Sequence, residues 1–232
     1  MTEAAAWAAE GAPHGALVVA RHQTAGRGRH GRTWADTPGQ SLMLSLVLRP
    51  VLPPEHVALL GLATGLAVTD ATGAFEVEAQ IKWPNDVLVG GRKLAGVLAE
   101  AAWSGAAPTV VVGVGVNVEQ EAFGALDGRA VSLRQAADRP IRRLDPLPPL
   151  LAHLAERVDQ VERDPAGLVR AVEERMDGIG APVTVGFPEA DRPPVAGVLL
   201  GLAADGALRL ATDAGEQSFH AGEVTLRPPV IP

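Results

Sequence analysis

An arginine- and glycine-rich segment, residues 23–34 (QTAGRGRHGRTW), carries the clearest sign of chemistry in this chain. From Arg21 to Arg32 the sequence holds four arginines, two histidines and no acid, whereas the whole protein has a formal net charge of −7. Arginine presents a planar fork of donors that suits carboxylate and phosphate groups, and interleaved glycines let the backbone approach a ligand closely. The pattern predicts a flexible loop that closes over a small anion.

Arginine–glycine segments also occur in disordered tails that contact nucleic acid. Here the segment lies between two strand-like runs, Leu17–Ala20 and Ser41–Leu48, so we place it inside a domain and favour the anion loop. The acidic balance of the chain argues against general DNA binding. A regulator that binds nucleic acid through this loop is the non-enzyme alternative.

A second motif, Lys82–Asp86 (KWPND), is followed closely by Lys93–Gly96 (KLAG). A lysine in an apolar strand is costly to bury unless its ammonium meets an anion, although either lysine taken alone would more often reach solvent at a strand end. Together with the arginine loop, the two lysines indicate an anion-binding site. The middle of the first motif is typical of a tight turn, in which Asp86 could serve as a turn residue only.

A third pattern, Val111–Asn117 (VVGVGVN), places two glycines on a valine-rich strand, which indicates that another group packs close to the backbone. The run lacks the third glycine and the helix of a dinucleotide-binding fingerprint, and no Walker-type phosphate loop is present. Six scattered histidines and no cysteine give no metal-ligand spacing and no thiol nucleophile.

In this order and spacing, the three motifs resemble those of biotin protein ligases, over nearly the whole chain. The resemblance implies an α+β fold. Residues 1–180 would form a mixed β-sheet with packed helices, of the class II aminoacyl-tRNA synthetase and biotin ligase type, and residues 181–232 a small Src-homology-3-like β-barrel. Lipoate or octanoate–protein ligases share this fold but differ at these motifs, and they are the enzyme alternative.

The resemblance implies an ATP-dependent carbon–nitrogen ligase. The biotin carboxylate would attack the α-phosphate of MgATP to give biotinyl-5′-AMP and pyrophosphate. A lysine of the biotin carboxyl carrier protein of acetyl-CoA carboxylase, or of another biotin-dependent carboxylase, would then displace AMP. We further expect a cytoplasmic protein, since no secretory signal is seen, a possible homodimer, and neither specific DNA binding nor a membrane partner.

Two departures from the family pattern concern the start of the chain. Larger members carry an N-terminal helix-turn-helix domain and act as repressors, and this sequence resembles the monofunctional type. The family also has a Ser-Thr-Asn segment that contributes to biotin recognition just before the first helix. That segment would end at about residues 1–3, where this sequence begins.

Residue by residue, the resemblance implies three sets of roles. The residues expected to be catalytic are Lys93, Arg29, Lys82 and Asp86. Those expected to bind biotin are Gln23, Gly26, Arg27, Gly28, Arg29, Lys93, Gly96, Gly113 and Gly115. Those expected to bind ATP or the adenylate are Arg29, Arg32, Trp34, Lys82, Asn85, Lys93, Asn117 and Ala137. We expect Mg²⁺ to be held mainly by phosphate oxygens and assign it no protein ligand.

The elements that must position these residues follow from periodicity and turn chemistry. We expect helices over Thr2–Glu10, Pro53–Thr72, Pro148–Glu162 and Pro165–Asp177, and a capping box at Ser132–Gln135 that begins a short helix. We expect strands over Leu17–Ala20 (short and buried), Ser41–Leu48, Ala79–Trp83, Val87–Val89, Leu94–Trp103 and Thr109–Val118 (buried on both faces), with five short strands after Gly180. Hairpin turns are expected at Gly90-Gly91 and Asp205-Gly206. The apolar runs are interrupted, so we expect neither a transmembrane helix nor a secretory signal.

Overall fold

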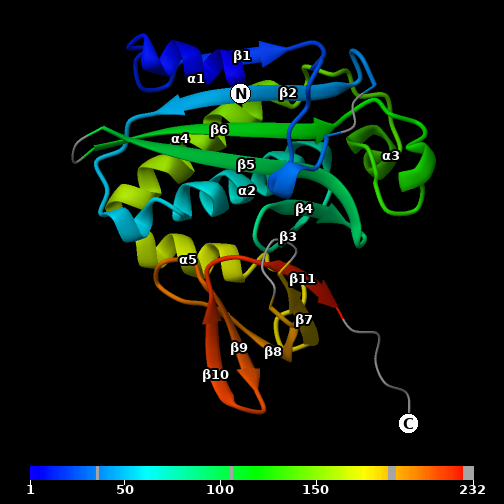
Figure 1. Ribbon diagram of the computed structural model, residues 1–232. Helices are drawn as coiled ribbons and strands as arrows, with labels where there is room; N and C mark the ends of the chain where they lie inside the picture. Colours follow the sequence, from blue (N-terminus) through cyan, green and yellow to red (C-terminus); the bar gives the residue numbers. More distant parts are fainter. Residues whose placement is uncertain (35–36, 105–106, 188–191, 227–232) are drawn as a thin grey trace.

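The computed structural model of the chain describes residues 1–34, 37–104, 107–187 and 192–226. Its first part contains five helices and six strands. The helices are α1 (Thr2–Ala9), α2 (Leu59–Thr72), α3 (Leu133–Ala137), α4 (Leu147–Arg163) and α5 (Pro165–Glu173), and the strands are β1 (Leu17–Ala20), β2 (Ser41–Leu48), β3 (Gln80–Lys82), β4 (Asp86–Val89), β5 (Arg92–Ser104) and β6 (Ala107–Asn117). The strands form one sheet in the order β1-β2-β6-β5-β4-β3 (Figure 1).

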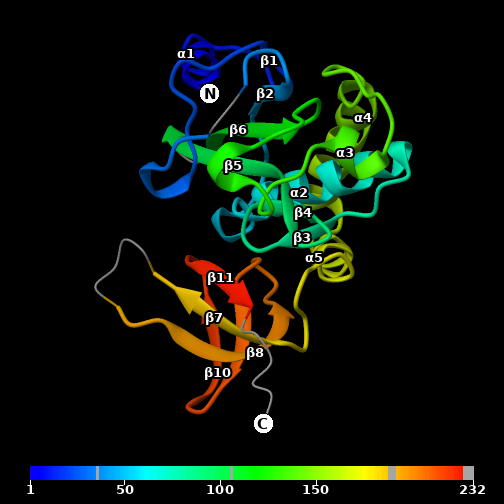
Figure 2. The same cartoon turned by 90° about the vertical axis from the view of Figure 1, so that its right-hand side faces the viewer.

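Other parts of the chain cover both faces of the sheet, and β6, the strand expected to be buried on both faces, is buried along most of its length. The even-numbered leucines of β2 face the main core, whereas Val47 on the other face packs with Ala4 and Ala8 of α1. Figure 2 shows α2 and α4 on one side of the sheet and the segment between β1 and β2 on the other. The strand alternation therefore separates a helix-packed face from a second face that this segment covers.

Strand pairing in this sheet is antiparallel between all six named strands. Among the described residues, parallel pairing occurs in two isolated bridges, Ile81 to Met176 and Lys93 to Ala130, and to that extent the sheet is mixed. The expectation that β1 is buried is wrong. It is an edge strand that pairs only with β2, and its Val19 is 39% exposed.

The long apolar run before β3 forms the central core helix. By length and composition, Pro54–Phe75 is apolar enough to cross a membrane, although we expected the sequence to contain no such run. Within the fold, 67% of its most apolar window is buried, and α2 contacts α4, α5 and the sheet. Its apolar surface therefore packs in the core. A buried core helix can have the length and apolar composition of a membrane-spanning helix.

A second sheet follows, with strands β7 (Pro182–Gly186), β8 (Val195–Leu202), β9 (Leu208–Thr212), β10 (Gly215–Phe219) and β11 (Glu223–Leu226). They are antiparallel in the order β10-β9-β8-β7-β11, consistent with a Src-homology-3-like barrel. The Asp205-Gly206 hairpin joins β8 to β9, with the Ala203 N–H donating to the Ala207 carbonyl at 2.8 Å. The proposed domain division at 180 and 181 falls just before β7.

Backbone hydrogen bonds tie β3 to the segment between α5 and β7, and core contacts join the two sheets. The Ile81 N–H of β3 donates to the Arg175 carbonyl at 2.7 Å, and the Asp177 N–H donates back to the Ile81 carbonyl at 2.9 Å. Buried residues of both sheets, such as Leu42 and Leu208, belong to one hydrophobic cluster. The second sheet therefore lies directly below the edge of the first (Figure 1).

Candidate active site

The arginine-rich loop folds back on itself as a small arm, residues 26–34, which we call the arginine arm. The Gly28 N–H donates to the Arg32 carbonyl at 2.7 Å, and the Trp34 N–H donates to the Gly26 carbonyl at 3.1 Å. A Cβ on Gly26 would lie 2.6 Å from the backbone carbonyl oxygen of Trp34, so the arm can close in this way only because residue 26 is glycine. At its tip, His30 and Gly31 adopt left-handed backbone angles (φ 55° and 67°).

The arginines of the arm reach acids and a carbonyl on both sheets. Arg27 pairs with Glu100 of β5, and Arg32 pairs with Glu223 of β11 at 2.7 Å. Arg29 donates to the Gly222 carbonyl at 3.3 Å. No motif in the sequence pointed to Glu100 or Glu223. Because the ion pairs are solvent-exposed, each contributes little free energy and can be exchanged for a ligand anion.

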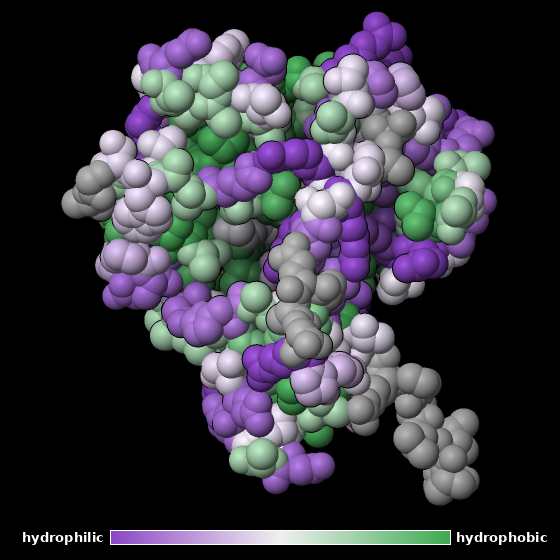
Figure 3. Space-filling model, in the orientation of Figure 1, coloured by the Kyte–Doolittle hydropathy of each residue, from purple (hydrophilic) through white to green (hydrophobic). Residues whose placement is uncertain are grey.

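The base of the arm rests on two of the glycines singled out in the sequence. A Cβ on Gly115 would lie 2.7 Å from the Trp34 ring, and one on Gly96 would lie 2.9 Å from it. The side chains of these positions share one face of the sheet, since Gly96 and Gly115 are directly opposite each other. The glycines thus form a flat floor that accepts a planar group. Figure 3, in the orientation of Figure 1, shows hydrophilic residues across the centre of the molecular surface, with apolar residues beside them.

Lys93 lies beside this floor. Its ammonium pairs with Asp86 at 2.5 Å and lies 5.5 Å from the centre of the Trp34 ring. The Trp34 Nε1 is buried and has no hydrogen-bond partner among the described residues. The structure therefore brings five predicted residues into one cluster, namely Trp34, Asp86, Lys93, Gly96 and Gly115.

The side chains of the Lys82–Asp86 motif make different contacts. Asn85 fastens the turn to β5, because its side chain donates to the Val97 carbonyl at 2.8 Å and its own carbonyl accepts from the Val97 N–H at 2.9 Å. Lys82 is directly opposite Asp86 in the β3–β4 pair and is half-buried, and it forms no ion pair with another described residue. The motif thus brings Asp86 to Lys93 and leaves Lys82 available beside them.

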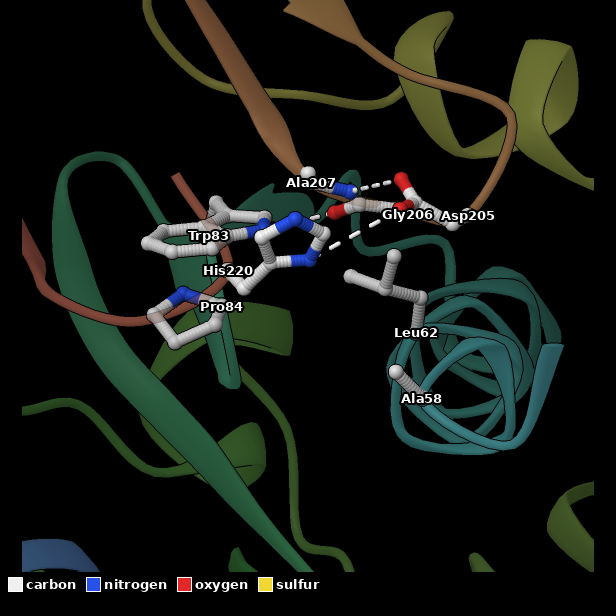
Figure 4. A pocket seen from close by; sticks show the side chains of 8 residues that line it. All are labelled: Ala58, Leu62, Trp83, Pro84, Asp205, Gly206, Ala207 and His220. Carbon is white, nitrogen blue, oxygen red and sulfur yellow. Dashed lines mark hydrogen bonds and ion pairs between the residues drawn. The ribbon is translucent and has the colours of Figure 1, made fainter. Parts of the chain in front are cut away.

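Trp83 turns to the other side, toward the second sheet (Figure 4). Its indole N–H donates to the Gly206 carbonyl at 3.1 Å. Next to this bond a cavity of about 100 Å³ is lined by Ala58, Leu62, Trp83, Pro84, Asp205, Gly206, Ala207 and His220. The cavity is lined by none of the predicted site residues. We assign it to the junction between the sheets because its walls come from both.

Asn117 holds the far end of the floor. Its side-chain amide donates to the Lys93 and Val131 carbonyls, both at 3.3 Å. The Lys93 N–H donates to the Arg129 carbonyl, and the Val131 N–H donates to the Lys93 carbonyl. Asn117 therefore fixes the backbone of the lysine and of the segment that leads into α3. The expected capping box is present at Ser132, and Ala137 is the last residue of α3.

Two predicted biotin-binding positions, Gln23 and Gly113, lie outside the Trp34 cluster. Gln23 is half-buried next to Gly26, with its Oε1 3.1 Å from the position of a Cβ on that glycine. Gly113 faces the Met1 side chain, whose sulfur would lie 2.6 Å from an added Cβ. Burial, and then the charge of nearby Arg27, lower the pKa of the Met1 α-amino group.

The arrangement suits an organic anion better than a metal. Among the described residues there is no group of three or more histidines, aspartates or glutamates that could hold a metal ion. The arm instead supplies three guanidinium groups, and the floor adds the Lys93 ammonium. These cations lie around the glycine floor on which the flat Trp34 ring rests, so a carboxylate or phosphate bound beside that ring would meet them.

Comparison with known proteins identifies relatives of this chain. Residues 2–117 match the Biotin/lipoate A/B protein ligase family, and residues 178–227 match the Biotin protein ligase C terminal domain. A biotin--[acetyl-CoA-carboxylase] ligase of Paracoccus denitrificans is 36% identical over 93% of this chain and 92% of its own length. One from Mycobacterium tuberculosis is 41% identical over 75% of this chain, and the match spans 65% of that relative.

Among solved structures, a biotin protein ligase from Aquifex aeolicus in complex with biotin and ATP has a TM-score of 0.81 and 30% sequence identity, covering 93% of this chain and 90% of its own. Fold, site and matches define a ligase of the biotin/lipoate class. Within that class, the chain belongs to the biotin protein ligase family.

Proposed function

We propose that this protein activates biotin with ATP and transfers it to a lysine of a biotin carboxyl carrier protein. In the first step the biotin carboxylate oxygen bonds to the α-phosphorus of ATP, and pyrophosphate leaves. In the second step the carrier lysine amine attacks the mixed anhydride, so that an amide forms and AMP leaves. The named relatives are biotin--[acetyl-CoA-carboxylase] ligases, which makes the acetyl-CoA carboxylase carrier our first choice of acceptor.

The single observation that supports this proposal most is the arginine arm lying over the Gly96–Gly115 floor next to Lys93. Biotin has a planar ureido group and a carboxylate, and the α-phosphate gains negative charge as the first step proceeds. Lys93, Arg27 and Arg29 would stabilise that charge, and Lys82 would add to it from β3. A closed arm would also keep water from the adenylate.

The remaining ligands follow from the same site. Mg²⁺ would enter on the phosphate oxygens of ATP and neutralise their charge, since the described residues offer no metal-ligand cluster. Asn117 and Ala137 would border the adenine, and Gln23 the biotin ring. Arg32, Asn85, Gly28, Gly26 and Gly113 would shape the arm and the floor. A cytoplasmic location, a possible homodimer, no specific DNA binding and no membrane partner complete the proposal.

The decisive experiment compares biotin with lipoate and octanoate as the acid that the enzyme activates. We expect biotin- and ATP-dependent release of pyrophosphate, with lipoate and octanoate at least tenfold less effective at equal concentration. Activation of lipoate in preference to biotin would support the alternative ligase. A DNA mobility shift that needs no biotin and weakens steeply with salt would support the nucleic-acid regulator.

A further inference from the structure

The second sheet holds the tip of the arginine arm through an ion pair with a defined geometry. Arg32 Nη1 lies 2.7 Å from Glu223 Oε1, and Arg32 Nη2 lies 2.9 Å from Glu223 Oε2. Two parallel N–H···O contacts fix the orientation of both groups, which a single-point ion pair does not. Because the pair is solvent-exposed, it can still open, so it combines a fixed orientation with reversibility.

The start of β11 is shaped to receive the arm. Gly222 is buried with φ 142°, and a Cβ at this position would lie 2.6 Å from Val185 Cγ1 of β7. Its carbonyl accepts a hydrogen bond from Arg29 at 3.3 Å. Val224 is 4% exposed and belongs to the core, so the alternation of the strand turns Glu223 outward. Two consecutive residues of β11 therefore contact arginines on both sides of the tip of the arm.

The arm thus connects the two sheets. At its base, the Trp34 ring lies on Gly96 and Gly115 of the first sheet. At its tip, Arg29 and Arg32 contact β11 of the second sheet. The base can stay in place while the contacts at the tip break, so the second sheet is positioned to control the opening of the arm.

We propose that Glu223 is a positioning residue for the ligase reaction, and that it holds Arg32 so that the second sheet keeps the arm closed over the adenylate. The inference rests on the proposed function, because it needs an adenylate under the arm. It assigns Arg32 to a carboxylate of the protein, whereas the resemblance assigned this arginine to ATP. The two assignments differ in whether the charges of the pair can be exchanged.

Glu223→Arg tests the pair by repulsion, because two guanidinium groups would then face each other. We expect the adenylate to escape about fivefold faster, as for the loss of one well-oriented surface ion pair, while single-turnover pyrophosphate release stays within about twofold of wild type. Escape is measured as the biotin found on added albumin relative to the biotin found on the carrier. Amide hydrogen exchange over residues 28–32 of the free protein should become faster in parallel.

Exchanging the two charges gives the decisive variant. Arg32→Glu alone should release adenylate as Glu223→Arg does. The double variant restores a pair of opposite charges and should return adenylate escape and hydrogen exchange to within about twofold of wild type, a rescue that a role in folding alone does not predict. Glu216→Arg is the matched control, because it breaks the ion pair with Arg209 on the same sheet and should leave retention unchanged.

Retention of the adenylate at the wild-type level by Glu223→Arg would overturn the inference. So would a double variant that releases pyrophosphate as slowly as an impaired Arg32→Glu, because Arg32 would then act on the nucleotide itself. If Glu223→Arg melts at a lower temperature than wild type, Glu223→Gln removes the charge without repulsion and should still release adenylate about twofold faster. No change in that variant would overturn the inference too.

The proposed function and this inference fail in different ways. If wild type forms no adenylate from biotin and ATP, the ligase proposal fails, while hydrogen exchange of the free protein still decides whether Glu223 holds the arm. If biotin is activated but retention does not depend on the pair of Arg32 and Glu223, only the inference fails.

Discussion

Lys93 is the residue at which most contacts of the candidate site meet. Its ammonium lies between Asp86 and the Trp34 ring, and its backbone is held by Arg129, Val131 and Asn117. A lysine fixed at both ends loses little further freedom when an anion arrives, so its charge can act on the bound ligand directly. The sequence identified it by motif, but two of its backbone partners, Arg129 and Val131, come from a loop that no pattern connected to it.

Replacing Lys93 by alanine should therefore impair adenylate formation much more than folding. A lost charge-assisted hydrogen bond is worth on the order of 1.5–3 kcal/mol, or about ten- to a hundredfold in kcat/KM for pyrophosphate release. Arg92→Ala removes the neighbouring exposed cation and should retain wild-type activity. Wild-type pyrophosphate release by Lys93→Ala would remove this lysine from the site.

Gly115→Ala tests the floor by shape instead of charge. The added Cβ would meet the Trp34 ring at 2.7 Å, so the ring must leave or the strand must shift. We expect a shifted tryptophan emission spectrum and at least a tenfold weaker affinity for biotin. The control is Gly65→Ala in α2, where an added Cβ meets nothing within 4 Å and helix propensity favours alanine. Unchanged emission and biotin affinity in Gly115→Ala would show that the floor is not used.

Among the elements, the arginine arm connects the sequence motif to the fold. Its arginines and glycines were predicted, and so was its place between two strands. Its contacts with Glu100, Gly222 and Glu223 were not, since they join residues far apart in the chain. These contacts are two exposed ion pairs and one hydrogen bond to a carbonyl, which suits an element that must open and close.

Ligand should slow amide hydrogen exchange over residues 26–32. In the free chain the contacts of the arm include exposed ion pairs, the Gly222 contact and short backbone hydrogen bonds, and a bound carboxylate or phosphate would add charged partners. The measurement compares free protein with protein containing biotin and MgATP, with β10 as the internal reference. Equal exchange in both states would contradict closure of the arm on ligand.

Arg29→Gly should weaken retention of the adenylate more than its formation. Arg29 lies near the tip of the arm and reaches the second sheet, so its loss frees the arm to open while the mixed anhydride is present. Activated biotin would then escape and label bystander lysines, such as those of added albumin. This chain has only two lysines, Lys82 and Lys93, so labelling of the enzyme itself adds little background.

Mass spectrometry of albumin incubated with biotin, ATP and each enzyme makes the comparison. Arg209→Gly, which breaks a surface ion pair with Glu216, is the matched control and should remain selective. An Arg29→Gly variant that is inactive, or as selective as wild type, would show that Arg29 does not retain the intermediate.

Element boundaries show where local patterns suffice. Strands β1 and β2 match their predicted ranges, and so do β8 and β11, which the sequence predicts over Val195–Leu202 and Glu223–Leu226. The other strands differ from their predicted ranges at their ends by a few residues. The helix predicted over Pro165–Asp177 ends instead at Glu173, because Arg175 and Asp177 give their backbone groups to Ile81 of β3. That pairing depends on a strand far away in the sequence, so helical periodicity could not reveal it.

At the scale of the whole molecule, the two sheets share one hydrophobic cluster and are joined by Trp83. The sequence predicted both sheets, and it predicted Asp205-Gly206 as a hairpin. Nothing in a hairpin signal says that its carbonyl receives an indole from the other sheet. The position of the second sheet, which brings Glu223 to Arg32 of the arm, could not be predicted either, because local sequence signals do not show contacts between distant residues.

Trp83→Phe should loosen this junction. It removes the indole donor and leaves the Gly206 carbonyl next to a small cavity without its partner, at a cost of about 1–3 kcal/mol. Chemical unfolding should report that loss, whereas Trp7→Phe, at a position 47% exposed, should stay near wild type. Equal stability of both variants would mean that the bond does not hold the sheets together.

The most direct test of the central claim is transfer of biotin to a carrier. Purified protein is mixed with biotin, MgATP and the carrier domain of an acetyl-CoA carboxylase, and the carrier is weighed by mass spectrometry. We predict the mass increase of one biotinyl group, absent without ATP, absent when the acceptor lysine of the carrier is replaced by arginine, and much slower with Lys93→Ala. A carrier that stays unmodified while a known biotin ligase labels it in parallel, or that gains a lipoyl group instead when both acids are present, would contradict the account.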